Sequence, residues 1–254
     1  MLLFSTDIDG TIFDGPATAE IFASFWKNLQ ALPEPPLLAY NSGRSLADIQ
    51  DLLGNTILPG PDFIIGGVGT EIYDQRNSQL LTDWHEVLSG AWSFEKIDSI
   101  LRAQIPDIEA QPDECQNAFK CSWFWHDKSN EDIERLRQLI ATAGLEAQIV
   151  YSSDRDLDLL PLAANKGNAL RWLAESQELP LDRVAVAGDS GNDSSMFLVE
   201  SVYGVVVSNA ETSLIEAVAG RNVHLASQAC ARGVIEGLTR LPEWQHLSPD
   251  THSA

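Results

Sequence analysis

The sequence predicts an α/β fold, in which a doubly wound, mostly parallel, Rossmann-like core sheet carries an inserted α+β cap domain. Three observations lead to this prediction. Short apolar runs alternate with amphipathic helical segments near both ends of the chain, and these runs end in polar loops. The middle of the chain breaks this rhythm and is rich in tryptophan. We therefore assign residues 1–82 and 163–254 to the core and residues 83–162 to the cap.

The first expected strand delivers two carboxylates. The apolar run at residues 2–4 leads into Asp7 and Asp9, and then into Gly10 and Thr11. Such a run is typical of a strand covered on both faces, and ligands bind at the carboxyl ends of these strands. If the strand continued, Asp7 and Asp9 would share a direction. Taken alone, the pair is either a strand-end turn with solvated acids or part of a cation site.

Two more strands complete the first part of the core. Apolar residues at helical spacing predict a helix over residues 17–32, and the proline-rich stretch after it ends that helix. The next expected elements are a strand at 37–40, a helix at 46–53 and a strand at 63–65. Ser42 and Gly43 again follow a strand. Dense glycine at residues 66–69 indicates close approach of the backbone to a ligand or a neighbouring strand.

The inserted segment predicts a small sheet with helices. Its expected elements are helices at 94–105 and 130–143 and strands at 118–126, 147–152 and 156–161. Trp123 and Trp125 alternate along one of these strands, so they either stack on a sugar or pack in the cap core, and core packing is the favoured interpretation. We interpret His85 and His126 as surface or satisfied histidines rather than ligands.

The alternation of strand and helix resumes after the insertion. The first expected element is a helix that begins at residues 165–168 and runs through residue 174. It is followed by a strand at 184–187, a helix containing 196–199, a strand at 204–207 and a helix at 213–218. The strand at 184–187 ends in the polar loop at residues 188–193. Right-handed crossovers place these strands in one sheet, with the insertion over its carboxyl edge. Residues after Leu241 are expected to fray.

The composition excludes several classes of function. The 254 residues carry a formal net charge of −21, which opposes sequence-independent binding to nucleic acid or to anionic membranes. Three cysteines without Cys-x-x-Cys spacing indicate neither a disulfide framework nor a zinc site. We find no export signal and no apolar run of membrane-spanning length, so we expect a cytoplasmic protein.

The polar loops together supply a set of residues that suits phosphoryl transfer. The set comprises Asp7, Asp9, Ser42, Lys166, Asp189, Asn192 and Asp193. Mg²⁺ prefers oxygen ligands, which Asp7 and Asp189 could supply. A carboxylate can then attack phosphorus, while Asp9 protonates the leaving alcohol and later activates water. Lys166 would act as a point charge, and the Ser42 hydroxyl would donate to phosphate oxygens.

Four segments carry a resemblance to the haloacid dehalogenase superfamily. Residues 7–11, 42–44, 166–167 and 188–193 look like its four ordered motifs, and the insertion resembles the large α/β cap of its sugar-phosphate phosphatases. Over nearly its whole length the chain resembles the sucrose-phosphate phosphatase and mannosylfructose-phosphate phosphatase group. The segments that carry this closer resemblance are 41–44, 61–70, 120–124 and 151–161.

The resemblance implies a role for each core residue. Asp7 would be the nucleophile and Asp9 the acid and base. The implied metal site is Asp7, the Asp9 backbone carbonyl, Asp189 and Asp193, the last through a metal-bound water. The implied phosphate-binding residues are Ser42, Gly43, Lys166 and Asn192. Ser42 stands where sucrose-phosphate phosphatases commonly have threonine, which leaves the disaccharide open and favours the mannosylfructose branch.

The resemblance also singles out residues that could contact the sugar. These are Glu71, Lys120, Asp154, Asp156 and Asp158. Pairs of polar groups that meet vicinal hydroxyls fix the orientation of a sugar, and the alternative for each residue is a solvated loop. Glu71 follows the glycine-dense segment of the core, whereas the other four lie with Trp123 and Trp125 in the segment assigned to the cap.

The sequence therefore predicts a Mg²⁺-dependent phosphatase that hydrolyses a phosphorylated disaccharide through an aspartyl-phosphate. One alternative keeps the fold but acts on another sugar phosphate, or is a phosphomutase. Another is an inactive sugar-binding partner of the glycosyltransferase that makes the substrate. We expect a monomer with a small-molecule substrate, and we name that upstream glycosyltransferase as a candidate partner.

Overall fold

The computed structural model describes residues 2–152, 154–242 and 244. The chain forms two compact units, one built from Met1–Leu80 and Asn165–Ala254 and the other from Leu81–Ala164. Each unit has its own sheet and its own apolar core. The predicted combination of an α/β core and an inserted α+β segment is confirmed.

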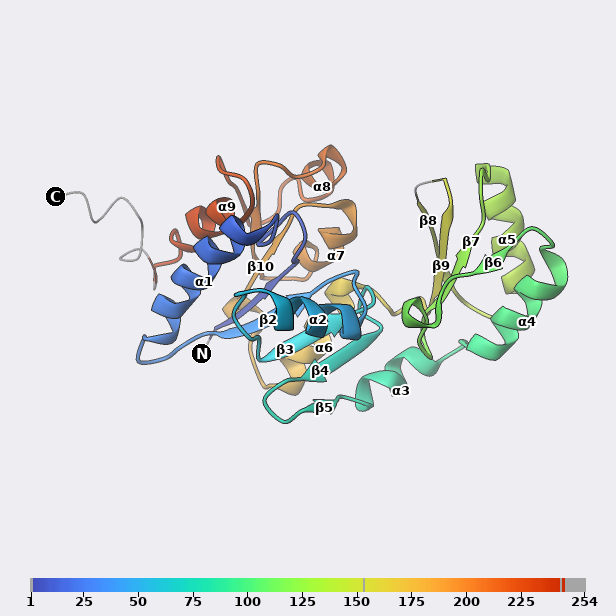
Figure 1. The fold of residues 1–254 in the computed structure, drawn as a ribbon, viewed down its shortest axis with the longest axis horizontal. Coiled ribbons are helices and arrows are strands. Elements are labelled where there is room, and N and C mark those ends of the chain that lie inside the picture. The colour runs from blue at the N-terminus through green and yellow to red at the C-terminus, as the bar shows by residue number, and fades with distance from the viewer. Residues whose placement is uncertain (1, 153, 243, 245–254) are drawn as a thin grey trace. The chain divides into compact units, whose positions relative to one another are not determined.

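The first unit is built on an eight-stranded sheet in the order β12-β11-β10-β1-β2-β3-β4-β5 (Figure 1). Its strands are β1 (Leu3–Thr6), β2 (Leu37–Asn41), β3 (Phe63–Gly66), β4 (Glu71–Asp74), β5 (Gln79–Leu80), β10 (Val184–Gly188), β11 (Tyr203–Val206) and β12 (Val223–Leu225). The pairs from β12 to β3 are parallel, whereas β4 and β5 form an antiparallel edge. After β1 the chain builds β2 and β3 on one side and later β10 and β11 on the other. The strand order therefore reverses beside β1, where ligands bind in such sheets.

Helices cover both faces of this sheet. They are α1 (Pro16–Gln30), α2 (Leu46–Asn55), α6 (Lys166–Ser176), α7 (Ser194–Phe197), α8 (Thr212–Ala217) and α9 (Cys230–Leu238), with 3₁₀ turns at Leu181–Arg183 and Gly191–Asp193. In Figure 1, α1 and α9 lie side by side, and they share one apolar core with alternate residues of the strands. Leu2 and Phe4 belong to that core, and Leu3 between them is buried on the other face of the sheet. The run is continuously apolar because both faces of the strand are covered.

The second unit is a four-stranded antiparallel sheet in the order β6-β7-β9-β8. Its strands are β6 (Glu109–Ala110), β7 (Cys121–Phe124), β8 (Gln148–Ser152) and β9 (Asp156–Leu160), and its helices are α3 (Asp83–Ser89), α4 (Phe94–Gln104) and α5 (Asn130–Thr142), with a 3₁₀ turn at Asp113–Cys115. Residues of α4 and α5 share an apolar core with every second residue of β7 and β9. Trp123 and Trp125 are buried in this core, so the packing interpretation of both residues is confirmed.

Some elements were not expected from the sequence. They are α3, α9, β4, β5, β6 and β12. The expected fraying after Leu241 is wrong for Trp244, which is 3% exposed and packs on the α1 and α9 core. Residues 245–254 lie outside the described part of the chain. No helix in that described part combines the length and the apolar character that a membrane crossing requires.

Candidate active site

The backbone after β1 places Asp7 at the reversal point of the sheet. Its amide donates to the carbonyl of Ala187 at 3.0 Å, so Asp7 is still held against β10 and is only 5% exposed. The chain then turns sharply, because the Ile8 carbonyl accepts from the amides of Thr11, Ile12 and Phe13. Gly10 is required in this turn. Its φ is +73°, and a Cβ there would lie 2.2 Å from an Asp189 carboxylate oxygen.

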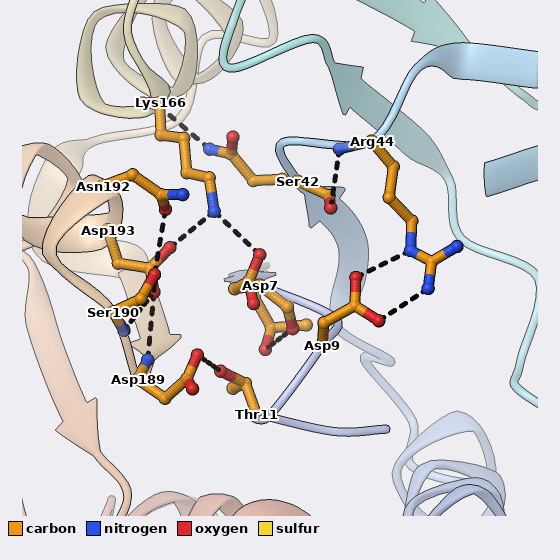
Figure 2. A network of polar contacts seen from close by, with 12 residues as sticks. Asp7, Asp9, Thr11, Ser42, Arg44, Lys166, Asp189, Ser190, Asn192 and Asp193 are labelled. Atoms are coloured by element: carbon orange, nitrogen blue, oxygen red, sulfur yellow. Dashed lines mark hydrogen bonds and ion pairs between the residues drawn. The ribbon is translucent and has the colours of Figure 1, made fainter. Parts of the chain in front are cut away.

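Lys166 reaches Asp7 from the first residue of α6 (Figure 2). Its ammonium nitrogen lies 2.7 Å from Asp7 Oδ1 and 2.6 Å from Asp193 Oδ1, and the side chain is fully buried. Asn165 caps the helix by accepting from the Asn168 amide. Asn41 Nδ2, at the end of β2, donates to the Lys166 carbonyl at 3.0 Å. The end of β2 and the N-terminal cap of α6 thus fix the backbone at Lys166.

The loop after β10 supplies the other acids. Asp193 Oδ2 accepts from the amides of Asp189 and Ser190 at 3.0 and 2.9 Å, so this side chain both folds its own loop and binds Lys166. Asp189 is held from the opposite side, because Thr11 Oγ1 donates to its Oδ1 at 3.1 Å. The two strand-end loops are therefore locked to each other.

The site carries more negative charge than its lysine compensates. Burial raises the pKa of Asp7 to about 7, against the lowering effect of Lys166. Burial, reinforced by Asp193, raises the pKa of Asp189 to about 6. Burial opposes the charge of Lys166, but Asp7 and Asp193 outweigh it and raise the pKa of the ammonium. Carboxylate oxygens of Asp7, Asp189 and Asp193 lie within 4.8 Å of one another. This oxygen-rich, under-compensated group fits a hard divalent cation such as Mg²⁺.

Asp9 faces away from this group. Figure 2 shows its carboxylate turned toward Arg44, which binds it through two parallel hydrogen bonds. Nε donates to Oδ2 at 2.6 Å and Nη2 donates to Oδ1 at 2.7 Å. The Asp9 side chain is therefore not among the clustered metal candidates, and the role implied for it there rests on its backbone carbonyl.

The expected phosphate-binding residues lie around the same edge. Ser42 directly follows β2, is 2% exposed, and accepts from the Arg44 amide at 3.2 Å. A Cβ at Gly43 would lie 4.0 Å from the Asn192 amide nitrogen, so these two loops are neighbours. Asn192 is exposed and accepts from Ser190 Oγ at 3.2 Å. The core residues predicted from the sequence thus meet at one edge of the sheet: Lys166 lies at the start of α6, and the others lie in the segments that follow β1, β2 and β10.

The second unit has a polar cluster of its own, on the sheet face opposite α4 and α5. Asp158 and Asp156 alternate on β9 with buried leucines. Asp158 accepts from Ser122 Oγ at 2.6 Å and pairs with Lys120 Nζ at 3.3 Å. Asp156 accepts from Arg155 through both oxygens, at 3.0 and 3.1 Å. The Arg155 guanidinium also lies over the Phe124 ring. Lys120, Asp156 and Asp158 therefore share one polar face.

The other two expected sugar contacts are placed differently. Asp154 is exposed in the turn between β8 and β9, in a left-handed conformation with φ +51°, and its carbonyl accepts from the Asp127 amide. Glu71 is the first residue of β4 in the first unit. Asp154 thus belongs to the same unit as the Asp156 and Asp158 cluster, and Glu71 belongs to the other unit.

Sequence reasoning missed several residues that support the site. They are Thr11, Asn41 and the Asp9 partner Arg44 in the first unit, and Ser122 with Gln111 in the second. All of them except Gln111 lie within a quoted motif or segment, which is the signal that could have identified them. Gln111 donates to Asp156 at 3.2 Å from outside any motif, and no local pattern marks it.

Comparison with known proteins adds an independent finding. The family model described as sucrose-6F-phosphate phosphohydrolase matches residues 1–241. The mannosylfructose-phosphate phosphatase of Agrobacterium fabrum is 40% identical over 239 residues, which cover 93% of this chain and 95% of that protein. The probable sucrose-phosphatase 2 of Arabidopsis thaliana is 32% identical over 98% of this chain, but the chain spans only 61% of its length.

A solved structure agrees with these sequence matches. The sucrose-phosphatase from Synechocystis, in complex with sucrose and phosphate, superposes with a TM-score of 0.80 at 28% identity. The match covers 94% of this chain and 97% of the other. It therefore includes residues of both compact units.

Proposed function

The chain belongs to the sucrose-6F-phosphate phosphohydrolase family within the haloacid dehalogenase superfamily, and it is a phosphatase. We propose that its substrate is a phosphorylated disaccharide of the mannosylfructose-phosphate or sucrose-6F-phosphate type. The observation that carries the proposal is the buried Lys166, hydrogen-bonded to both Asp7 and Asp193 beside Asp189. A lysine buried between carboxylates is costly to maintain without a function for its charge.

In the proposed reaction Asp7 is the nucleophile. Its carboxylate oxygen forms a bond to phosphorus as the bond from phosphorus to the sugar oxygen breaks, and Asp9 gives its proton to that oxygen. Asp9 then takes a proton from water, whose oxygen bonds to phosphorus while the bond between phosphorus and the Asp7 carboxylate oxygen breaks. Lys166, Ser42 and the Asn192 amide offer donors for the phosphate oxygens.

A divalent cation would complete the site. We propose that Asp7, Asp189 and the Asp9 carbonyl hold Mg²⁺, with Asp193 acting through water. When bound, the ion supplies the positive charge that the three carboxylates and a phosphate dianion together demand. The raised pKa values of Asp7 and Asp189 support this assignment, since burial and the neighbouring carboxylates disfavour their ionised forms, which a bound cation would stabilise.

We propose that the unit Leu81–Ala164 is the cap that recognises the sugar. Its support is the polar face formed by Lys120, Ser122, Asp156 and Asp158, because charged side chains that are already hydrogen-bonded present oriented donors and acceptors to hydroxyl groups. Asp154 and Glu71 remain proposed contacts that this cluster does not include.

Phosphate release tests the proposal. The protein is incubated with Mg²⁺ and mannosylfructose phosphate, sucrose-6F-phosphate or hexose phosphates, and inorganic phosphate is measured. We expect the disaccharides to give the largest kcat/KM. Asp7→Asn should lower release by at least about 10³-fold, because the covalent route is lost. No release from any sugar phosphate would refute the proposal, and full Mg²⁺-dependent turnover by Asp7→Asn would refute the nucleophile assignment.

A cap variant separates recognition from chemistry. Asp158→Asn should raise KM for the disaccharide about 10-fold, because a charged hydrogen-bond acceptor contributes roughly 1.5–3 kcal/mol. It should leave turnover of p-nitrophenyl phosphate within about 2-fold of wild type. Equal losses on both substrates would show that the polar face does not recognise sugar. Asp98→Asn on α4, a partly exposed aspartate that is also ion-paired, is the matched control and should change neither value.

A further inference from the structure

The structure holds the proposed acid and base in a specific orientation. Arg44 grips both oxygens of Asp9 through the parallel fork at 2.6 and 2.7 Å, a geometry that a guanidinium supplies and an ammonium does not. The two side chains are partly exposed, at 36% for Arg44 and 50% for Asp9. The contact between Arg44 and Asp9 is therefore open to solvent and does not contribute to packing of the apolar core.

The backbone of Arg44 is fixed independently of this contact. Its amide donates to Ser42 Oγ, and its carbonyl accepts from the Gly67 amide at 2.8 Å. Gly66 lies so close that a Cβ there would be 3.4 Å from the same carbonyl. One rigid loop after β2 therefore presents a hydroxyl for phosphate and a guanidinium fork for Asp9. Asp9, by contrast, lies within the tight turn that begins at Ile8, and its side chain points out of this turn toward the fork.

We infer that Arg44 is the positioning residue of Asp9. It fixes the plane and direction of the carboxylate whose proton goes to the sugar oxygen and is later replaced from water, and it touches neither of these reacting atoms itself. Each carboxylate oxygen has two lone pairs. One lone pair of an oxygen can therefore exchange a proton while the other lone pair still accepts from Arg44. This inference rests on the proposed function, since it assigns Arg44 to the acid and base step of that reaction.

Substrates with different leaving groups test the inference. A sugar alkoxide must be protonated as it leaves, whereas p-nitrophenolate leaves without a proton. Arg44→Gln should lower kcat for the disaccharide phosphate on the order of 10- to 100-fold with little change in KM, since positioned proton transfer contributes on the order of 10²- to 10⁴-fold. The single-turnover burst of p-nitrophenolate should fall by less than about 3-fold. Arg44→Lys, which keeps charge but loses the fork, should lie between.

A double-mutant cycle decides whether Arg44 acts through Asp9. In an Asp9→Asn background, Arg44→Gln should change the burst rate and the residual disaccharide turnover by less than about 2-fold, because the group that it positions is already lost. Arg137→Gln, an exposed arginine that is also ion-paired, is the control for loss of charge. Thermal melting establishes that each variant is folded.

The outcomes separate the two proposals. A wild type that releases no phosphate from any ester refutes the proposed function. If the wild type is active, two results would refute the positioning role of Arg44. In the first, Arg44→Gln slows the p-nitrophenolate burst and the disaccharide turnover equally. In the second, Arg44→Gln lowers activity by the same factor whether or not Asp9 is present. Either result would mean that Arg44 acts on phosphate directly.

Discussion

At the scale of single residues, the site depends on where uncompensated charge lies. Asp7 and Asp193 share one lysine, while Asp189 has only the Thr11 hydroxyl as a side-chain partner among the contacts described above. The elevated pKa values follow from burial together with this shortage of positive charge. A cation and a proton therefore compete for the same oxygens.

This competition predicts a pH-dependent affinity for Mg²⁺. Asp7 and Asp189 titrate near 7 and 6 in the folded protein, against 3.8 for an ordinary aspartate. Below pH 6 both carry protons that the ion must displace, so affinity should rise as pH increases from about 5.5 to 7.5. Calorimetry in two buffers of different ionisation enthalpy should show release of about one proton near pH 6.5. An affinity that is unchanged over this range would contradict the prediction.

The same shifts set the sign of a stability effect. Without Mg²⁺, the folded protein binds protons at Asp7 and Asp189 more readily than the unfolded chain does. Their contribution to stability is therefore fully present below pH 3.8 and is lost as pH rises through the folded pKa values of about 6 and 7. Saturating Mg²⁺ should reverse this trend above pH 6, which urea unfolding with and without the ion can measure.

At the scale of elements, the sequence identifies the strands that carry motifs better than the elements that only pack. Asp7, Ser42 and Asp189 end apolar runs, and a run followed by a polar loop is a local signal. Helix α9 was missed because Gly233 and Gly237 lower its helix propensity by roughly 1 kcal/mol each. Both glycines serve tertiary packing: a Cβ at Gly237 would lie 2.4 Å from Val205 on β11. The close packing of α9 on β11 therefore outweighs the low helix propensity of its glycines, and the sequence of the helix alone does not reveal that packing.

The orientation of the Asp9 side chain toward Arg44 could not be predicted from the sequence either. The motif containing Asp9 and the motif containing Arg44 are both visible in the sequence, but their spacing does not say that one side chain turns to the other. The polar face of β9 was predictable, since Asp156 and Asp158 alternate with leucine. Gln111, the partner of Asp156, was not predictable, because it directly follows β6, a two-residue strand that is too short to leave a sequence pattern.

The turn between β3 and β4 controls the position of Lys166. Gly69 has φ +89°, and a Cβ there would lie 2.5 Å from the Asn165 carbonyl, directly before the lysine. Gly69→Ala should cost about 2–4 kcal/mol through left-handed strain and overpacking, and kcat should fall because α6 must shift. Gly54→Ala on α2 has open space around the new Cβ and should be neutral or stabilising. Equal melting temperatures and rates for the two variants would contradict this account.

Glu236 on α9 fastens the loop after β12. Burial would raise its pKa, but the Ser227 and Gln228 amides, the Ser227 hydroxyl and His224 bind its carboxylate and lower the pKa to about 2. Its stabilisation is present above pH 4.5 and is lost as pH falls toward 2. Glu236→Gln should therefore lower the free energy of unfolding by about 1–3 kcal/mol at pH 7. The difference from wild type, measured by urea unfolding, should shrink below pH 4; a constant difference would show that the charge is not responsible.

At the scale of the whole molecule, a strongly acidic protein must bind a dianion. The net charge of −21 repels a sugar phosphate at a distance, while Lys166 and a bound cation attract it at contact. The two effects differ in range. The Debye length falls from about 30 Å at 0.01 M ionic strength to about 10 Å at 0.1 M, so added salt screens the distant charges far more than the contacts within the site.

We therefore expect activity to rise with salt at low ionic strength. At saturating Mg²⁺, raising ionic strength from about 0.01 to 0.1 M should lower KM for the disaccharide phosphate about 2- to 5-fold and leave kcat nearly unchanged, because screening removes the global repulsion and spares the buried hydrogen bonds. Steady-state kinetics at constant pH and constant Mg²⁺ saturation measure this, with p-nitrophenyl phosphate as a second dianion that should follow the same trend. A KM that rises with salt for both substrates would show that local positive charge already dominates at a distance, and the acidic surface would then have no influence on substrate capture.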